Sequence, residues 1–166
     1  MDMHEYTLEE ISFSRKEDCR VLESVLNNWL SKPKILNYVE PKLNFPFKFK
    51  KWLSIYKNNK TNTFIIKKDN WIIGYISIRI SNDKNQCQLF HLFIDKSFRN
   101  NNLAQLLITK SEEFGRSIGM KIFMAELVTK NLAAINLFEK LGYKEKILKN
   151  HGYIKMVKVI TKPFNS

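Results

Sequence analysis

Apolar residues recur along this chain with two different periods, and the change between them separates predicted helices from predicted strands. Between residues 21 and 30 they lie three and four positions apart, which predicts one face of an amphipathic helix. From residue 63 onward, short runs rich in β-branched and aromatic residues are bounded by Asn, Asp and Gly, which is typical of strands and turns. We expect strands over Tyr6–Phe13, Thr63–Lys67, Trp71–Ile80, Gln86–Ile94, Lys121–Val128, Tyr143–Lys149 and Tyr153–Ile160, and helices through Val21–Leu30, Phe45–Tyr56, Asn101–Ile118 and Leu132–Leu141.

Several local signals refine these boundaries. Ser14 and Glu17 have the spacing of a capping box, in which each side chain bonds a free N–H group at the start of a helix. The stretch Lys32–Phe45 contains two prolines and is predicted to be a loop. Gly74, inside a predicted strand, suggests a β-bulge. Helix C-caps are expected at Gly119 and Gly142, and a hairpin turn about Asn150, His151 and Gly152.

The element order predicts an α+β (mixed α/β) fold. Two predicted helices follow the first strand, and two later ones each connect one strand to the next. A strand, crossover helix and strand force at least one parallel pair within an otherwise antiparallel sheet. We therefore expect a central, mostly antiparallel, twisted sheet of about seven strands with one parallel pair, flanked by about four helices. A length of 166 residues favours a single domain over residues 1–166.

The formal net charge of +12 would attract anions, but its composition argues against nucleic acid as the partner. Only five of the 28 basic residues are arginines, and the lysines are scattered rather than clustered. Base readout and phosphate clamping rely mainly on arginine.

The two cysteines, Cys19 and Cys87, form neither a disulfide framework nor a zinc motif. The acidic N-terminus lacks a signal-peptide core, and the most apolar stretch is too short to cross a bilayer. We expect a cytoplasmic protein without a metal site or membrane contact, either a monomer or a homodimer.

The segment from Leu92 to Ala104 carries the strongest chemical signal. An apolar strand enters a short polar loop that opens a helix, whose first turn has unpaired N–H groups and a partial positive charge. Such a turn can hold a phosphate, although a purely structural strand-to-helix turn has the same pattern.

Two motifs then resemble those of the GNAT superfamily of N-acetyltransferases. Arg99-x-x-Asn102-x-Ala104 is similar to the coenzyme A-binding pattern Gln/Arg-x-x-Gly-x-Gly/Ala. The run from Asn131 to Tyr143 is similar to Asn-x-x-Ala-x-x-Leu-Tyr-Glu-Lys-Leu-Gly-Phe. The spacing and the element order agree over nearly the whole chain, and the chain resembles members that acetylate ribosomal-protein N-termini. The resemblance implies a GNAT-like fold and transfer of an acetyl group from acetyl-coenzyme A.

The resemblance also implies residue roles. Backbone groups of Leu92, Phe93 and Ile94 would pair with the pantetheine arm, and backbone N–H groups of Arg99, Asn100, Asn101, Asn102, Leu103 and Ala104 would hold the pyrophosphate. Asn131 and Ala134 would contact the cofactor near its sulfur, with Phe138 beside the thiol and Lys140 reaching toward the phosphates. Equally, Asn131 suits a helix N-cap, Phe138 a core position and Lys140 a solvated surface.

Three positions depart from the family pattern, and one of them, Lys96 in place of a common proline, matters little. Asn102 replaces a glycine, but Asn tolerates a positive φ better than most residues, so the backbone conformation is expected to survive. Phe138 replaces a tyrosine that often serves as general acid, and phenylalanine has no proton to give. The departing thiol, with a pKa of about 8.5, is a fair leaving group without that proton.

For the general base we favour Glu126, five residues before Asn131, although an ion-paired carboxylate at a strand end fits the same position. Gln88, where other members carry a base, cannot take a proton. By strand alternation His91 points to the opposite face from Phe90 and Leu92, which favours a structural role unless a bulge intervenes.

The acceptor is predicted to be a primary amine, either a peptide N-terminus or a small amine such as a polyamine or amino sugar. The loop Lys32–Asn44 and the segment Phe45–Tyr56 are expected to shape its pocket. An acyl-coenzyme A-binding regulatory protein, or a catalytically weakened member of the same fold, is the alternative.

Overall fold

A computed structural model describes residues 5–57, 61–146 and 152–160. The elements follow one another as β1 (Tyr6–Ile11), α1 (Lys16–Trp29), α2 (Pro33–Val39), α3 (Phe49–Tyr56), β2 (Thr61–Lys68), β3 (Trp71–Ser81), β4 (Gln86–Ile94), the 3₁₀ turn η2 (Lys96–Phe98), α4 (Leu103–Ser117), β5 (Ile122–Val128), α5 (Leu132–Lys140), β6 (Lys144–Lys146) and β7 (Tyr153–Val159). The described part of the chain thus holds seven strands and five α-helices, one helix more than expected.

The strands form one sheet in the order β1-β2-β3-β4-β5-β7-β6. All neighbouring strands are antiparallel except β4 and β5, which pair in parallel. The predicted fold class is therefore confirmed: the crossover through α4 produces the parallel pair, as the element order required.

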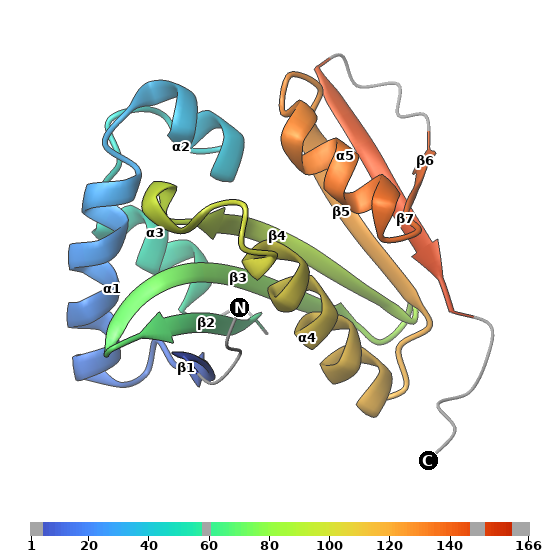
Figure 1. The fold of residues 1–166 in the computed structure, drawn as a ribbon, viewed down its shortest axis with the longest axis horizontal. Coiled ribbons are helices and arrows are strands. Elements are labelled where there is room, and N and C mark those ends of the chain that lie inside the picture. Colours follow the sequence, from blue (N-terminus) through green and yellow to red (C-terminus); the bar gives the residue numbers. More distant parts are fainter. Residues whose placement is uncertain (1–4, 58–60, 147–151, 161–166) are drawn as a thin grey trace.

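Each face of the sheet carries its own apolar cluster. One cluster joins α4 and α5 to the sheet through buried residues such as Leu107 and Phe138. The other joins α1, α2 and α3 to the opposite face through Leu22, Leu36 and Trp52. The sheet is therefore covered on both sides, and the helices of the two faces come from different halves of the sequence (Figure 1).

Strands β4 and β5 separate after a short paired stretch. Their parallel pairing covers only Gln86–Gln88 and Ile122–Met124, and beyond it the two strands diverge into a V (Figure 1). Helix α2 lies at the open end of this V and contacts both strands. Within the V, the facing backbone edges of β4 and β5 are not paired with each other and are open to a ligand.

Two β-bulges interrupt the register of β3. The first lies beside Gly74, where Ile66 pairs with Gly74 but Lys67 pairs with Ile72, so the bulge predicted at this glycine is confirmed. A Cβ at Gly74 would lie 2.9 Å from Cδ1 of Ile94, so any larger residue here would require the end of the Ile94 side chain to move. The second bulge was not predicted and gives β4 one extra residue, His91, whose φ is 58°.

Two local predictions near the N-terminus were wrong. Residues 33–39 form helix α2 rather than a loop, because Pro33 occupies its first turn, where a proline suits a helix. The capping box at Ser14 is absent: Arg15 is the N-cap of α1 without a side-chain bond, and the N–H of Ser12 donates to Oδ2 of Asp18 instead.

The C-caps at Gly119 and Gly142 are confirmed, with φ of 88° and 93°. Most of the turn predicted about Asn150 lies outside the described residues. Cys19 and Cys87 are both free thiols. None of the helices that the structure describes is long and apolar enough to traverse a bilayer.

Candidate active site

The loop that joins β4 to α4 is held in place by its own side chains. Asp95 accepts a hydrogen bond from the N–H of Ser97 at 2.9 Å and one from Nε1 of Trp29 at 3.1 Å. Nε of Arg99 donates to the carbonyl of Ile94 at 3.1 Å, and Nδ2 of Asn101 donates to that of Phe98 at 3.1 Å. These contacts preorganise the loop before any ligand arrives.

The same loop presents a row of free amides. Among the described residues, the N–H groups of Asn101, Asn102, Leu103, Ala104 and Gln105 have no acceptor, and the first helical bond runs from Leu106 to Asn102. Asn102 adopts φ 59° and ψ 20° and Asn100 φ 67°, so the expected positive φ at Asn102 is confirmed. Successive amides at a helix N-terminus favour an anion through their dipoles and partial charge.

The neighbouring strand edge is open as well. Beyond Gln88, β4 has no partner on its β5 side within the described part of the chain, while Gly74 and Tyr75 of β3 pair with Ile94 and Phe93 on the other side. The segment Leu92–Ile94 can therefore accept an extended ligand in the way that an edge strand accepts another strand.

Helix α5 places four sequence-predicted residues with different exposures. Oδ1 of Asn131 accepts from the N–H of Ala134 at 3.4 Å, so Asn131 is an N-cap. Ala134 is half-buried, and Lys140 is exposed. Phe138 is only 1% exposed and packs edge-on against Tyr143 at 4.9 Å, so its ring belongs to the core.

Glu126 is the exposed carboxylate of β5. Strand alternation places it on the face opposite Phe123 and Ala125, which belong to the α4–α5 cluster. Lys155 lies opposite it on β7, but no described cation is within ion-pair distance of Glu126. Gln88 lies in the last residue pair before β4 and β5 separate.

The second bulge reverses the orientation expected for His91. Because the bulge inserts one residue, His91 and Phe90 share the face of α1, α2 and α3, and Leu92 packs on the other face. The prediction that His91 and Phe90 point to opposite faces was therefore wrong. His91 is only 4% exposed, which agrees with the structural role predicted for it. Its ring stacks at 4.2 Å on that of Trp52.

His91 belongs to a buried polar cluster that sequence reasoning missed. Its Nε2 lies 2.7 Å from Oε2 of Glu40, which also accepts from the hydroxyl of Tyr56. Burial opposes the charge on Glu40, but the hydrogen bonds from His91 and Tyr56 outweigh it and hold the pKa of that carboxyl below its ordinary value. Burial also lowers the pKa of His91 and raises that of Tyr56.

This arrangement assigns the protons. A Glu40 carboxylate can only accept, so Nε2 of His91 carries the proton of their hydrogen bond, and Nδ1 of His91 has no partner in the described part of the chain. The cluster ties the C-cap of α2 and the last turn of α3 to the bulge of β4. The sequence holds one signal for the helix that carries Glu40, namely Pro33 as a helix start, but none that connects Glu40 with His91.

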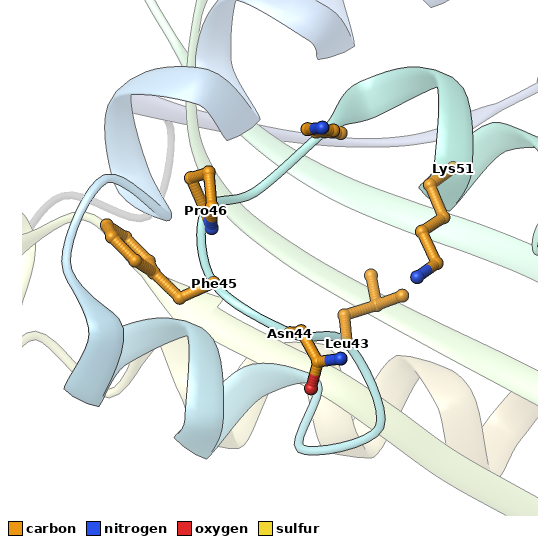
Figure 2. Close-up of a pocket in the computed structure, with 6 residues that line it drawn as sticks. Leu43, Asn44, Phe45, Pro46 and Lys51 are labelled. Carbon is orange, nitrogen blue, oxygen red and sulfur yellow. The ribbon is translucent and has the colours of Figure 1, made fainter.

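A pocket opens beside this cluster, in the chain between α2 and α3. Leu43, Asn44, Phe45, Pro46, Lys48 and Lys51 line it, and the Lys51 side chain extends toward Leu43 (Figure 2). The N–H of Leu43 donates to the carbonyl of Glu40 at 3.2 Å, so the buried cluster holds one wall of the pocket.

Comparison with known proteins agrees with this geometry. The family model described as the acetyltransferase (GNAT) family matches residues 24–143. A curated relative, the uncharacterized N-acetyltransferase MJ1207 of Methanocaldococcus jannaschii, is 27% identical over an alignment of 124 residues that covers 69% of this chain and 54% of the relative. The chain thus spans about half the length of this curated relative.

Solved structures share the fold at low identity. The ribosomal-protein-S18-alanine N-acetyltransferase of Escherichia coli superposes with a TM-score of 0.65 at 15% identity, covering 93% of this chain and 92% of that one. The spermidine N-acetyltransferase of Vibrio cholerae, solved with CoA and spermine, gives 0.74 at 16%, covering 98% and 99%. At such identity the likeness shows the fold alone.

Proposed function

This chain belongs to the GNAT family of acetyltransferases, and on that premise we propose that it transfers the acetyl group of acetyl-coenzyme A to a primary amine. Transfer proceeds by direct attack of the amine while both substrates are bound. The acceptor is a peptide N-terminus or a small amine.

The row of free amides from Asn101 to Gln105 carries this proposal. A diphosphate at that point would give each amide an acceptor and would lie at the positive end of the α4 dipole. The loop contains one carboxylate, Asp95, and its oxygens already accept hydrogen bonds from Trp29 and Ser97 rather than from the free amides.

The open V then accommodates the rest of the cofactor. The backbone of Leu92, Phe93 and Ile94 pairs with the amides of the pantetheine arm, which enters between β4 and β5. Asn131 and Ala134 at the start of α5 lie at the sulfur end, Phe138 supports that end from the core, and Lys140 approaches the phosphates from the last turn of α5.

The chemistry asked of the protein is modest. Bound acetyl-coenzyme A supplies an activated thioester carbonyl. A backbone N–H of β4 stabilises the negative charge that develops on the carbonyl oxygen, and the site holds the amine against the carbonyl carbon. Glu126, exposed on β5, takes a proton from the nitrogen of the amine as that nitrogen bonds to the carbonyl carbon. Solvent protonates the departing thiolate, because Phe138 has no proton to give.

Phe138 also motivates a second candidate, an acyl-coenzyme A-binding protein with little or no turnover. Its ring is buried and carries no hydroxyl, so this chain lacks a general acid at that position. Binding and turnover measurements separate the two candidates.

The first experiment is calorimetric titration with acetyl-coenzyme A, followed by release of free thiol in the presence of a panel of amines. We expect saturable binding and amine-dependent thiol release. Binding without release for every amine would favour the second candidate, and absence of binding would overturn both.

A further inference from the structure

The segment that covers the open end of the V has an unusual charge balance. We call residues 32–57, which comprise α2, α3 and the chain between them, the α2–α3 segment. Its exposed cations are Lys32, Lys34, Lys42, Lys48, Lys50, Lys51 and Lys57. Its single acidic residue is Glu40, which is 5% exposed. The surface of this segment therefore carries lysine charges and no carboxylate.

The charge of Glu40 does not neutralise these lysines. Both of its oxygens are engaged, by the His91 ring, the Tyr56 hydroxyl and the N–H of Lys42. Within the described residues, none of the seven lysines lies within ion-pair distance of a carboxylate, a property that they share with other exposed lysines such as Lys84 and Lys121 but not with Lys67, Lys68 and Lys158. The lysines of the α2–α3 segment are thus available to an external anion.

Two of these lysines line the pocket between α2 and α3. Lys48 and Lys51 lie at the N-terminus of α3, where the helix dipole adds further positive potential. Leu43 and Phe45 supply apolar lining, and the Phe45 ring remains 48% exposed. A group that combines an anion with a short apolar stem fits this lining.

Packing contacts also connect the pocket to the two strands that form the V. Helix α2 contacts β4 and β5, and Trp52 of α3 stacks on His91 in the β4 bulge at 4.2 Å. Phe47, next to the pocket residue Pro46, packs against Trp52 at 5.5 Å. The pocket therefore lies in a segment whose helices pack on β4 beside its open edge.

We propose that this pocket binds a carboxylate of the acceptor, so that the preferred amine is the N-terminus of a peptide with acidic side chains close behind it. This inference rests on the proposed function and narrows its acceptor class. Polyamines and basic peptides are repelled by Lys48 and Lys51. A peptide is favoured over nucleic acid because the α2–α3 segment contains no arginine to grip a phosphate with two hydrogen bonds.

The double variant Lys48→Glu/Lys51→Glu tests the pocket. Acidic residues in the first turn of a helix are favourable, so α3 tolerates the change. The matched control is Lys84→Glu/Lys121→Glu, which alters the net charge equally at two exposed lysines by the β3–β4 turn. Thermal unfolding of both variants checks that the fold is kept.

Three fluorescent peptides of equal length carry glutamate, glutamine or lysine after an N-terminal alanine. Their binding to the protein saturated with coenzyme A is measured by anisotropy, and their acetylation by thiol release. We expect the acidic peptide to bind at least about fivefold more tightly than the lysine peptide, an advantage that shrinks in high salt. The pocket variant should lose or reverse this preference, and the control should keep it.

Equal binding of the three peptides, or a preference unchanged in the pocket variant, would overturn the inference. Displacement of the acidic peptide by single-stranded RNA from the wild type but not from the pocket variant would assign the pocket to nucleic acid instead. The anisotropy arm needs no turnover, so an acidic preference without thiol release would support the inference while contradicting the proposed enzyme.

Discussion

Nε2 of His91 lies 2.7 Å from Oε2 of Glu40, and this contact joins the end of α2 to the bulge of β4. The two residues are 51 positions apart in the sequence. This contact therefore fixes α2, which covers the open end of the V, to β4, which forms one side of the V.

Replacing Glu40 tests the strength of this connection. Glu40→Gln removes the charge that accepts from both His91 and Tyr56, and leaves buried donors poorly matched. We expect the free energy of unfolding to fall by about 1–3 kcal/mol. Denaturant titration measures the loss. Glu113→Gln, an equal change of charge at an exposed site on α4, should stay within about 0.5 kcal/mol. Equal effects in the two variants would remove the special role of Glu40.

Acid should weaken the fold through the same pair. Both folded-state pKa values lie below their ordinary values, so the unfolded chain binds more protons in the intervening range and stability falls as pH falls. The loss begins below about pH 6.5, the ordinary value of histidine, and continues below about pH 4.3, that of glutamate.

The free energy of unfolding, measured from about pH 8 down to about pH 5, reveals this pH dependence, because that range spans the ordinary pKa of histidine. His91→Asn keeps a residue that tolerates the φ of 58° and removes the imidazole. Its slope should be flatter than that of the wild type. Parallel curves for the two proteins would show that His91 does not contribute.

The left-handed backbone at Asn102 predicts a specific sensitivity. Asn102→Val places a β-branched residue at φ 59°, which costs roughly 1–3 kcal/mol and turns the neighbouring amides away from a common point. We expect affinity for acetyl-coenzyme A, measured by calorimetry, to fall by roughly tenfold or more, an amount that corresponds to about 1.4 kcal/mol. Asn27→Val, on the exposed face of α1, should leave it unchanged. Unaltered affinity in the Asn102 variant would argue against the amide row as the diphosphate site.

Glu126→Gln examines the base. With a peptide acceptor, kcat should fall by roughly 10²–10⁴-fold while the affinity for acetyl-coenzyme A is kept. The glutamine side chain has nearly the same shape as glutamate but cannot accept a proton. Glu23→Gln, another exposed carboxylate, serves as control. A variant with full kcat would show that Glu126 is not the base.

The element order could be predicted from the sequence because its signals are local. Strand β4 has the predicted bounds of Gln86–Ile94, and α4 begins two residues from its predicted start. Asn102 illustrates the same point, since tolerance of a positive φ is a property of the residue itself. Helix α2 was missed because two prolines outweighed its short apolar pattern.

The orientation of His91 could not be predicted from the sequence. Alternation along a strand predicts the face of each side chain only while the register is regular, and nothing in the residues around His91 announces a bulge. Without the bulge there is no reason to connect His91 with Glu40, and the cluster that holds the α2–α3 segment remains invisible.

By itself, the sequence determined the order of the strands and of every helix except α2, the presence of a parallel pair, and the loop that opens α4, because periodicity and turn chemistry act over a few residues. Only the tertiary structure decided that β4 and β5 separate after Gln88, that Glu40 meets His91, and that Lys48 and Lys51 share a pocket. These relationships join residues far apart in the chain, and they depend on packing energies that are distributed over the whole core.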